Sequence, residues 1–207
     1  MPNHSEANAE NWFPMHFPCW ETILPKINPK KVLEVGSYEG RTSCFLADFL
    51  LKDPSSNLSI TSIDTWEGGR EHVGTDFNQV EEIFDHNMAI LKSKYAERIE
   101  LIKLKGYSSI ELAKIYSKNQ SKSIYDFIYI DGSHDAADVL LDAALSFKLV
   151  KNSGLICFDD FLWDLGGKNL LHSPRLAIES FINCNRDKIF LFDSGQARQC
   201  WIQKTNN

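Results

Sequence analysis

The sequence predicts an α/β protein built on a mostly parallel sheet, and three features of the chain indicate this class. Residues 125–161 read as two apolar strands joined by a stretch in which apolar side chains recur at three- and four-residue steps, which is one face of a helix. Near-continuous apolar strands joined by a helical crossover are typical of parallel neighbours in a buried sheet. The same strand–helix order recurs from residue 31 onward, and the chain closes on two strands with a short turn between them, which favours an antiparallel end.

The predicted elements follow one another without a linker or an internal repeat. The expected strands are 31–36, 58–63, 98–103, a run from residue 125 that stops at Asp131, a run that stops at Asp159, 188–193 and 199–204. The expected helices are 41–51, 76–94, 109–118, the stretch between Ala136 and Phe147, and one that starts with Ser173 as its cap and Pro174 in its first turn. We therefore expect a single domain over 1–207, with an N-terminal cap segment over 1–30 and a core over 31–204.

The segment 12–27 is rich in aromatic residues and proline, and it has two interpretations. It forms a short helix that covers the edge of the sheet, or its side chains help to close a substrate pocket. The side chains that would close the pocket are Trp12, Phe13, His16 and Trp20. Two glycine-bearing stretches, 65–75 and 162–172, are predicted to be loops.

The charge and hydropathy of the chain disfavour several classes of partner. The net charge of -6 provides no general attraction to nucleic acid or to anionic lipid. The sequence has no apolar run near the roughly 20 residues that a membrane span needs. Its N-terminus has no basic region followed by an apolar core, and its five cysteines are scattered without a CxxC pair, so we expect a cytoplasmic protein with reduced thiols.

The first strand leads through a glycine turn, from Gly36 to Gly40, into a helix. This is the first unit of a nucleotide-binding sheet, because a helix N-terminus offers free N–H groups to a ligand. The dinucleotide motif G-x-G-x-x-G is absent, since Tyr38 and Arg41 occupy its second and third glycine positions, and nicotinamide dinucleotides are therefore disfavoured. Asp64 ends the second strand, where a carboxylate can accept hydrogen bonds from both hydroxyls of a ribose.

Acidic residues end the two strands of residues 125–161: Asp131 the first, and Asp159 and Asp160 the second. Parallel strands point their carboxyl ends the same way, so these acids should meet at the edge where open α/β sheets bind ligands. Adjacent residues of a regular strand point to opposite faces, so Asp159 and Asp160 can reach one ligand only if the chain bends there. The alternative interpretation is that the three are solvated strand-end acids.

The order of elements and the segments EVGSYEG, IDGSH and FDDF, together with Asp64, resemble the class I S-adenosylmethionine-dependent methyltransferases. Within them the chain is similar to the small O-methyltransferases grouped with the macrolide-sugar and cephalosporin-biosynthesis enzymes, which hold magnesium with acids at the ends of the fourth and fifth strands. The resemblance covers residues 31–204. It implies a Rossmann-like, seven-stranded, mostly parallel sheet with an antiparallel last strand and helices on both faces.

The resemblance also implies a role for individual residues. The cofactor-binding residues would be Glu34, Gly36, Ser37, Tyr38, Gly40, Asp64, Thr65, Tyr107, Ser108 and Asp131. Magnesium, or another divalent cation, would be held by Asp131, Asp159 and Asp160. Asp131 and His134 would be catalytic, with His134 as the general base, because the ordinary pKa of histidine suits proton transfer near pH 7. His72 and His172, on the two predicted loops, are reserve candidates for that base.

The expected reaction is methyl transfer from S-adenosylmethionine to a hydroxyl of a sugar or another natural product, with neither nucleic acid nor membrane as a partner. A metal-independent methyltransferase of the same fold and a non-catalytic S-adenosylmethionine-binding module are the alternatives. Metal dependence of turnover distinguishes the expected enzyme from a metal-independent one. Product formation distinguishes it from a non-catalytic module. The sequence leaves the oligomeric state open, including a homo-oligomer.

Overall fold

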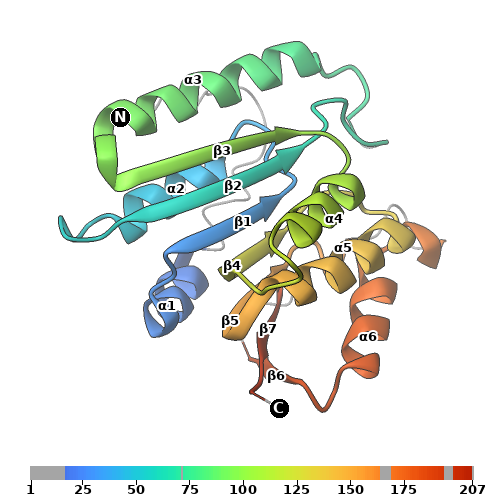
Figure 1. Cartoon of the computed structure of the whole chain (residues 1–207). Helices are drawn as coiled ribbons and strands as arrows, with labels where there is room; N and C mark the ends of the chain where they lie inside the picture. Colours follow the sequence, from blue (N-terminus) through green and yellow to red (C-terminus); the bar gives the residue numbers. More distant parts are fainter. Residues whose placement is uncertain (1–16, 71, 164–168, 194–197, 207) are drawn as a thin grey trace.

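A computed structural model describes residues 17–70, 72–163, 169–193 and 198–206 of the chain. Seven strands form one sheet in the order β3-β2-β1-β4-β5-β7-β6 (Figure 1). The strands are β1 Lys31–Val35, β2 Leu58–Asp64, β3 Ile99–Lys105, β4 Tyr125–Ile130, β5 Val150–Phe158, β6 Ile189–Phe192 and β7 Cys200–Lys204. Strands β1 to β5 pair in parallel, and β7 lies antiparallel to both β5 and β6. The predicted mostly parallel sheet with an antiparallel last strand is confirmed.

Helices cover both faces of the sheet (Figure 1). The α-helices are α1 Phe17–Ile27, α2 Arg41–Leu50, α3 Phe77–Tyr95, α4 Ser108–Lys118, α5 Ala136–Leu149 and α6 Pro174–Cys184, and the short 3-10 helices are η2 Ala96–Arg98 and η3 Leu170–His172. Successive side chains of β4 serve different cores: Phe127 and Tyr129 pack with α1, α2 and α3, whereas Ile128 and Ile130 pack with α4, α5 and α6. Burial on both faces explains why the central strands read as near-continuous apolar runs.

The N-terminal helix α1 belongs to the first of these cores. Trp20 is fully buried, and its ring meets those of Phe127, Tyr129 and Trp201 edge to face. Its indole N–H donates to the Gln199 side chain over 2.8 Å. Trp20 therefore packs under the sheet and does not face a pocket. The other side chains of the pocket-closing interpretation, Trp12, Phe13 and His16, lie outside the described residues.

Small differences from the predicted elements have local causes. Strand β3 runs two residues further than expected, to Lys105, because it pairs with β2 as far as Asp64. Ser173 occupies the cap position of α6 ahead of Pro174, as predicted, but its side chain makes no capping hydrogen bond. The turn expected at 194–196 lies outside the described residues. Within the part of the chain that the structure describes, no helix is long and apolar enough to cross a membrane.

Candidate functional site

The turn between β1 and α2 requires glycine because the protein itself crowds it. Gly36 has φ +84°, and a Cβ there would lie 2.0 Å from the main-chain oxygen of Asp131. Gly40, with φ +78°, would place a Cβ 2.7 Å from the end of the Met88 side chain. Close contact with the end of β4 therefore explains the glycine at position 36 before any ligand is considered. The turn therefore packs directly against the end of β4. The Asp131 N–H also donates to the Val35 carbonyl over 2.8 Å, which joins the two segments.

Asp64, at the end of β2, holds the glycine turn in place. Its Oδ2 accepts hydrogen bonds from the main-chain N–H groups of Ser37 and Tyr38 over 2.8 and 2.9 Å. Its Oδ1 accepts from the N–H of Trp66 over 2.7 Å. A carboxylate has about four acceptor positions, so these bonds leave about one for a ligand such as a ribose hydroxyl.

Glu34 lies fully buried on β1 below the turn. Its Oε2 accepts from the hydroxyls of Ser43 and Ser62 over 2.7 and 3.1 Å. Its Oε1 is buried and has no hydrogen-bond partner among the described residues. Burial raises the pKa of Glu34 to about 7, although the neighbouring hydroxyls act in the opposite direction. A buried carboxyl with an unused oxygen fits a cationic donor, such as the amino group of S-adenosylmethionine.

The remaining residues expected around a nucleoside lie in different environments. Tyr38 has φ +47°, and its partly exposed ring stacks on His72. Thr65 uses its hydroxyl to accept the N–H of Glu67. Tyr107 is 61% exposed at the start of α4, where a flat ligand could cover it. The next residue, Ser108, is turned away, since its hydroxyl donates to the buried Asp142 over 2.9 Å.

The acids at the ends of β4 and β5 come together, and a bend at Asp160 makes this geometry attainable. Asp160 has φ +53°, in the left-handed region that non-glycine residues seldom occupy. Its N–H donates to Oδ1 of Asp159 over 2.9 Å, while its Oδ2 lies 2.8 Å from Nε2 of His134. The strand has therefore ended before Asp160, and the opposite-face rule for a regular strand does not apply to this pair.

Asp131, His134 and Asp160 form the set that could hold a metal ion. One ligand atom of each lies within 4.8 Å of those of the other two. The 6%-exposed carboxylate of Asp159 instead accepts a short hydrogen bond from the Tyr129 hydroxyl, which also lies 3.0 Å from Oδ2 of Asp131. A small pocket lined by the segment 130–134 and by Phe158, Asp159 and Asp160 opens at this edge of the sheet.

The electrostatics of this cluster favour a cation. Burial raises the pKa of Asp131 well above its ordinary value, and the negative charges of Asp159 and Asp160 raise it further. Clustered carboxylates repel one another when they are all ionised, and a divalent cation among them removes that repulsion. Two carboxylates and an imidazole on neighbouring strand ends therefore have donors and charge suited to such an ion.

Two aromatic residues lie beside these acids in contacts that were not predicted from the sequence. Tyr129, which bridges Asp131 and Asp159, stands two positions before Asp131, and the two-residue period of a strand places both side chains on one face. Trp163 stacks on His134 with ring centroids 4.5 Å apart, a contact for which the sequence carries no signal.

The reserve histidines also have protein partners. The ring of His72 lies against Tyr38 and accepts the N–H of Gly69 on Nδ1. His172 lies 2.5 Å from a carboxylate oxygen of Asp135 and within 3.0 Å of Arg70, so it joins three segments near the start of α5. Only His134, among the three, is grouped with the acids at the ends of β4 and β5.

Replacement of Asp142 by asparagine is expected to stabilise the protein above neutral pH. Burial raises the pKa of Asp142 from 3.8 to about 7, so the folded state binds more protons than the unfolded state between these values. The wild type should therefore lose stability as the pH rises from 4 to 7, by up to about 4 kcal/mol from this group. The asparagine side chain keeps an acceptor for Ser108 and does not titrate.

The free energy of unfolding in urea, measured at pH 4 and pH 8, checks this expectation. The difference between Asp142→Asn and wild type should be small at pH 4 and clearly positive at pH 8. An equal difference at both pH values would show that the carboxyl is not held neutral by its surroundings.

A family comparison identifies the kind of protein to which this site belongs. A family model described as "Methyltransferase domain" matches residues 33–161, more than half of the chain. The chain belongs to this methyltransferase family. The matched region contains the glycine turn, Asp64, Asp131, His134 and both acids after β5. The resemblance to methyltransferases stated from the sequence is confirmed.

One relative and two solved structures extend the comparison. The protein named probable caffeoyl-CoA O-methyltransferase 3 of Dictyostelium discoideum is 28% identical over 141 residues, which are 68% of this chain and 47% of that protein. The chain therefore spans about half the length of this curated relative. The O-methyltransferase of Bacillus cereus, solved with S-adenosylhomocysteine (SAH), is 16% identical with a TM-score of 0.65, over 99% of this chain and 85% of that one.

A second solved structure is the MycE methyltransferase from the mycinamycin biosynthetic pathway, determined in complex with Mg and SAH. It is 18% identical, with a TM-score of 0.57, over 99% of this chain and 52% of that one. With sequence identities of 16% and 18%, these two solved structures show that the present chain shares their fold.

Proposed function

We propose that this protein is an S-adenosylmethionine-dependent O-methyltransferase that acts on a hydroxyl of a sugar or another natural product with the help of a divalent cation. The observation on which the proposal rests is the close packing of the turn at Gly36 against Asp131, at the end of β4. It joins a turn with a buried, partly unsatisfied carboxyl to a cluster of acids at the ends of the next strands. A cofactor held by the turn would thus lie beside a cation held by the cluster.

The cofactor would be held by the residues of the turn and by the acids on either side of it. Glu34 would accept the cofactor's amino group on Oε1, and the N-terminus of α2 together with Asp64 would receive the polar groups of the nucleoside. Tyr38 and Tyr107 offer exposed rings to the base. S-adenosylmethionine supplies a methyl group bound to a positively charged sulfur.

The cation would be held by Asp131 and Asp160, which belong to the set that could hold a metal ion. Asp159 would be the third acid, beside Asp160, whose N–H its Oδ1 accepts. When bound, such a cation lowers the pKa of a hydroxyl that it contacts. Tyr129 fixes the carboxylates of Asp131 and Asp159 relative to each other, which spares them reorganisation when a ligand arrives. His134, whose Nε2 lies 2.8 Å from Oδ2 of Asp160, is the proposed base for the hydroxyl proton.

The names of the relatives support a small-molecule acceptor. One is named for caffeoyl-CoA and another for mycinamycin biosynthesis. The net charge of -6 argues against nucleic acid as the acceptor. All five cysteines are free thiols in the structure, in keeping with the reducing cytoplasmic location that we propose.

The proposal is tested by incubating the protein with S-adenosylmethionine, Mg²⁺ and a panel of sugar nucleotides, macrolides and catechols. Formation of SAH together with a methylated product, lost on addition of EDTA, is the expected result. Binding of SAH by calorimetry without turnover on any acceptor would favour a non-catalytic binding module. Full turnover in EDTA would favour a metal-independent methyltransferase.

Replacement of Glu34 by glutamine is expected to weaken the binding of SAH by about 10- to 100-fold, because a hydrogen bond between charged groups is lost. The pKa of Glu34 is about 7 without cofactor, so this carboxyl is mostly protonated at pH 6. It must lose that proton before it can pair with the ammonium group of SAH. The affinity of the wild type should therefore rise between pH 6 and pH 8. Calorimetry at both pH values measures the effect.

The control for this comparison is Glu97→Gln, which changes an exposed carboxylate elsewhere on the chain. Glu97→Gln should bind SAH as the wild type does, including the rise of affinity with pH. If Glu34→Gln keeps both the affinity and that rise, Glu34 is a structural residue and does not receive the cofactor.

A further inference from the structure

Trp66 lies two residues beyond Asp64, between the glycine turn and helix α3. It is 4% exposed and has φ +50°, a left-handed conformation that is uncommon for a bulky side chain. Its ring lies among side chains of α3 and β3. Neither the family match nor the expected cofactor residues assign it a role.

The side chain of Trp66 binds the glycine turn directly, and its main chain binds Asp64, which holds that turn. The indole N–H donates to the main-chain oxygen of Tyr38 over 2.9 Å, and the main-chain N–H donates to Oδ1 of Asp64 over 2.7 Å. Asp64 in turn accepts the N–H groups of Ser37 and Tyr38. The Tyr38 peptide units are thus held at the carbonyl by the indole and at the amide by Asp64, which suits a non-glycine residue kept at φ +47°.

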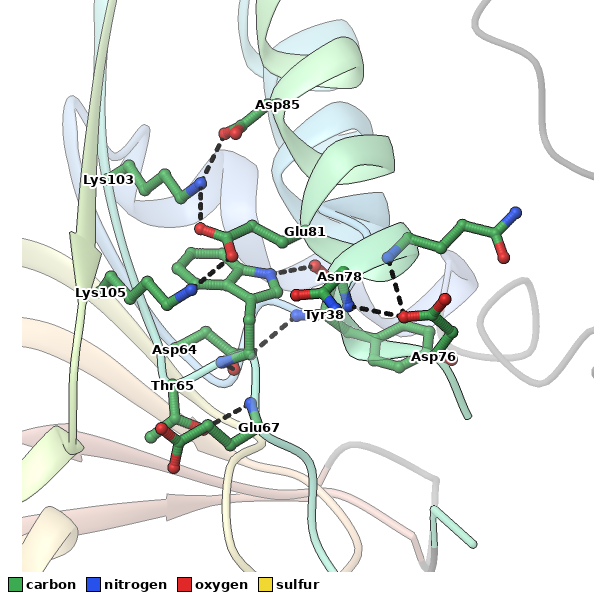
Figure 2. Close-up of polar contacts among 12 residues, drawn as sticks. Tyr38, Asp64, Thr65, Glu67, Asp76, Asn78, Glu81, Asp85, Lys103 and Lys105 are labelled. Atoms are coloured by element: carbon green, nitrogen blue, oxygen red, sulfur yellow. Dashed lines mark hydrogen bonds and ion pairs between the residues drawn. The ribbon is translucent and has the colours of Figure 1, made fainter. Parts of the chain in front are cut away.

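The ring of Trp66 is fixed from α3 and β3. Phe84 packs against it with ring centroids 4.8 Å apart, and Nζ of Lys103 lies 4.5 Å from its centroid. Lys103 is held there by ion pairs of 2.8 Å to Glu81 and 2.7 Å to Asp85 (Figure 2). Because these contacts fix the ring, its indole N–H points at the carbonyl of Tyr38.

We infer that Trp66 is a positioning residue, which holds the turn from Ser37 to Tyr38 in the conformation that receives the cofactor. A side chain that only packed in this core would need no hydrogen-bond donor, and phenylalanine would pack there in a similar way. The indole N–H instead binds the carbonyl of a residue with an unfavourable backbone conformation. The link to the cofactor rests on the proposed function, whereas the link to the turn rests on the geometry.

The test compares Trp66→Phe with Val80→Ala, a matched change in the same small core that removes no hydrogen bond to the turn. Amide hydrogen exchange of Ser37 and Tyr38 is measured in the cofactor-free proteins, and the dissociation constant of SAH is measured by calorimetry. In Trp66→Phe we expect the two amides to exchange at least about 10-fold faster and SAH to bind about 10-fold more weakly. Val80→Ala should change neither by more than about twofold.

Equal exchange rates in the two variants would overturn the inference, and so would an unchanged affinity for SAH in Trp66→Phe. If the wild type fails to bind SAH, the proposed function is wrong, and the exchange rates still decide whether Trp66 holds the turn. If Trp66→Phe fails to fold, the wild type alone is informative. Its Trp66 indole N–H should exchange at a rate close to those of Ser37 and Tyr38, and exchange at least about 10-fold faster would overturn the inference.

Discussion

Asp160→Ala and Asp131→Asn are each expected to lower kcat/KM for methyl transfer by about 100-fold or more, and EDTA is expected to do so reversibly. Both substitutions remove a carboxylate from the cluster that would hold the cation, and a bound cation contributes several kcal/mol to the stabilisation of developing charge. The loss should come without unfolding. Because burial and the neighbouring acids raise the pKa of Asp131, the Asp131→Asn protein should be at least as stable as the wild type in EDTA at pH 8.

Glu82→Gln, an exposed change on α3, serves as the control for activity and for thermal unfolding. Activity is measured with saturating S-adenosylmethionine over a range of Mg²⁺ concentrations. Full activity of both variants, maintained in EDTA, would contradict the metal-assisted mechanism and would leave the acids as groups that orient the substrate.

His134→Ala is expected to lower kcat by about 10²- to 10⁴-fold, the usual contribution of a general base. The imidazole lies 2.8 Å from Asp160 and stacks on Trp163, so its ring is held at the pocket rather than in solvent. The pH–rate profile of the variant should lose the limb that reports deprotonation of the base. The measurement is kcat from about pH 5.5 to about pH 9, a range that spans the ordinary pKa of histidine.

The affinity of the same variant for Mn²⁺ separates two roles, because His134 lies close enough to Asp131 and Asp160 to be a ligand. A general base predicts an affinity within about threefold of the wild type, whereas a lost ligand typically costs more than about 10-fold. The exposed His86→Ala on α3 is the control. A large loss of Mn²⁺ affinity with an unchanged pH profile would make His134 a ligand and not the base.

The arrangement of acids at one edge of the sheet was predictable because it depends on strand direction alone. Parallel pairing of β4 with β5 brings Ile130 opposite Phe158, and the next residues must then meet. Direction and register are encoded in apolar periodicity, which is local and regular. The same reasoning placed Asp64 beside the glycine turn.

The parts of the site that could not be predicted depend on contacts between distant segments. The left-handed bend at Asp160 has no local signal, since no glycine or proline marks it. The pKa of Glu34 depends on complete burial by residues from several elements. In the sequence, Trp66 is recognisable only as a large apolar residue. Its hydrogen bond to Tyr38 is known only from the fold.

A crystal structure of the protein with SAH and Mn²⁺ tests the joint site most directly. Data collected at the manganese absorption edge are expected to show an anomalous peak between the carboxylates of Asp131 and Asp160, with SAH along the Gly36–Gly40 turn and its amino group at Glu34. A manganese peak remote from these acids, or SAH bound away from the turn, would contradict the proposed arrangement.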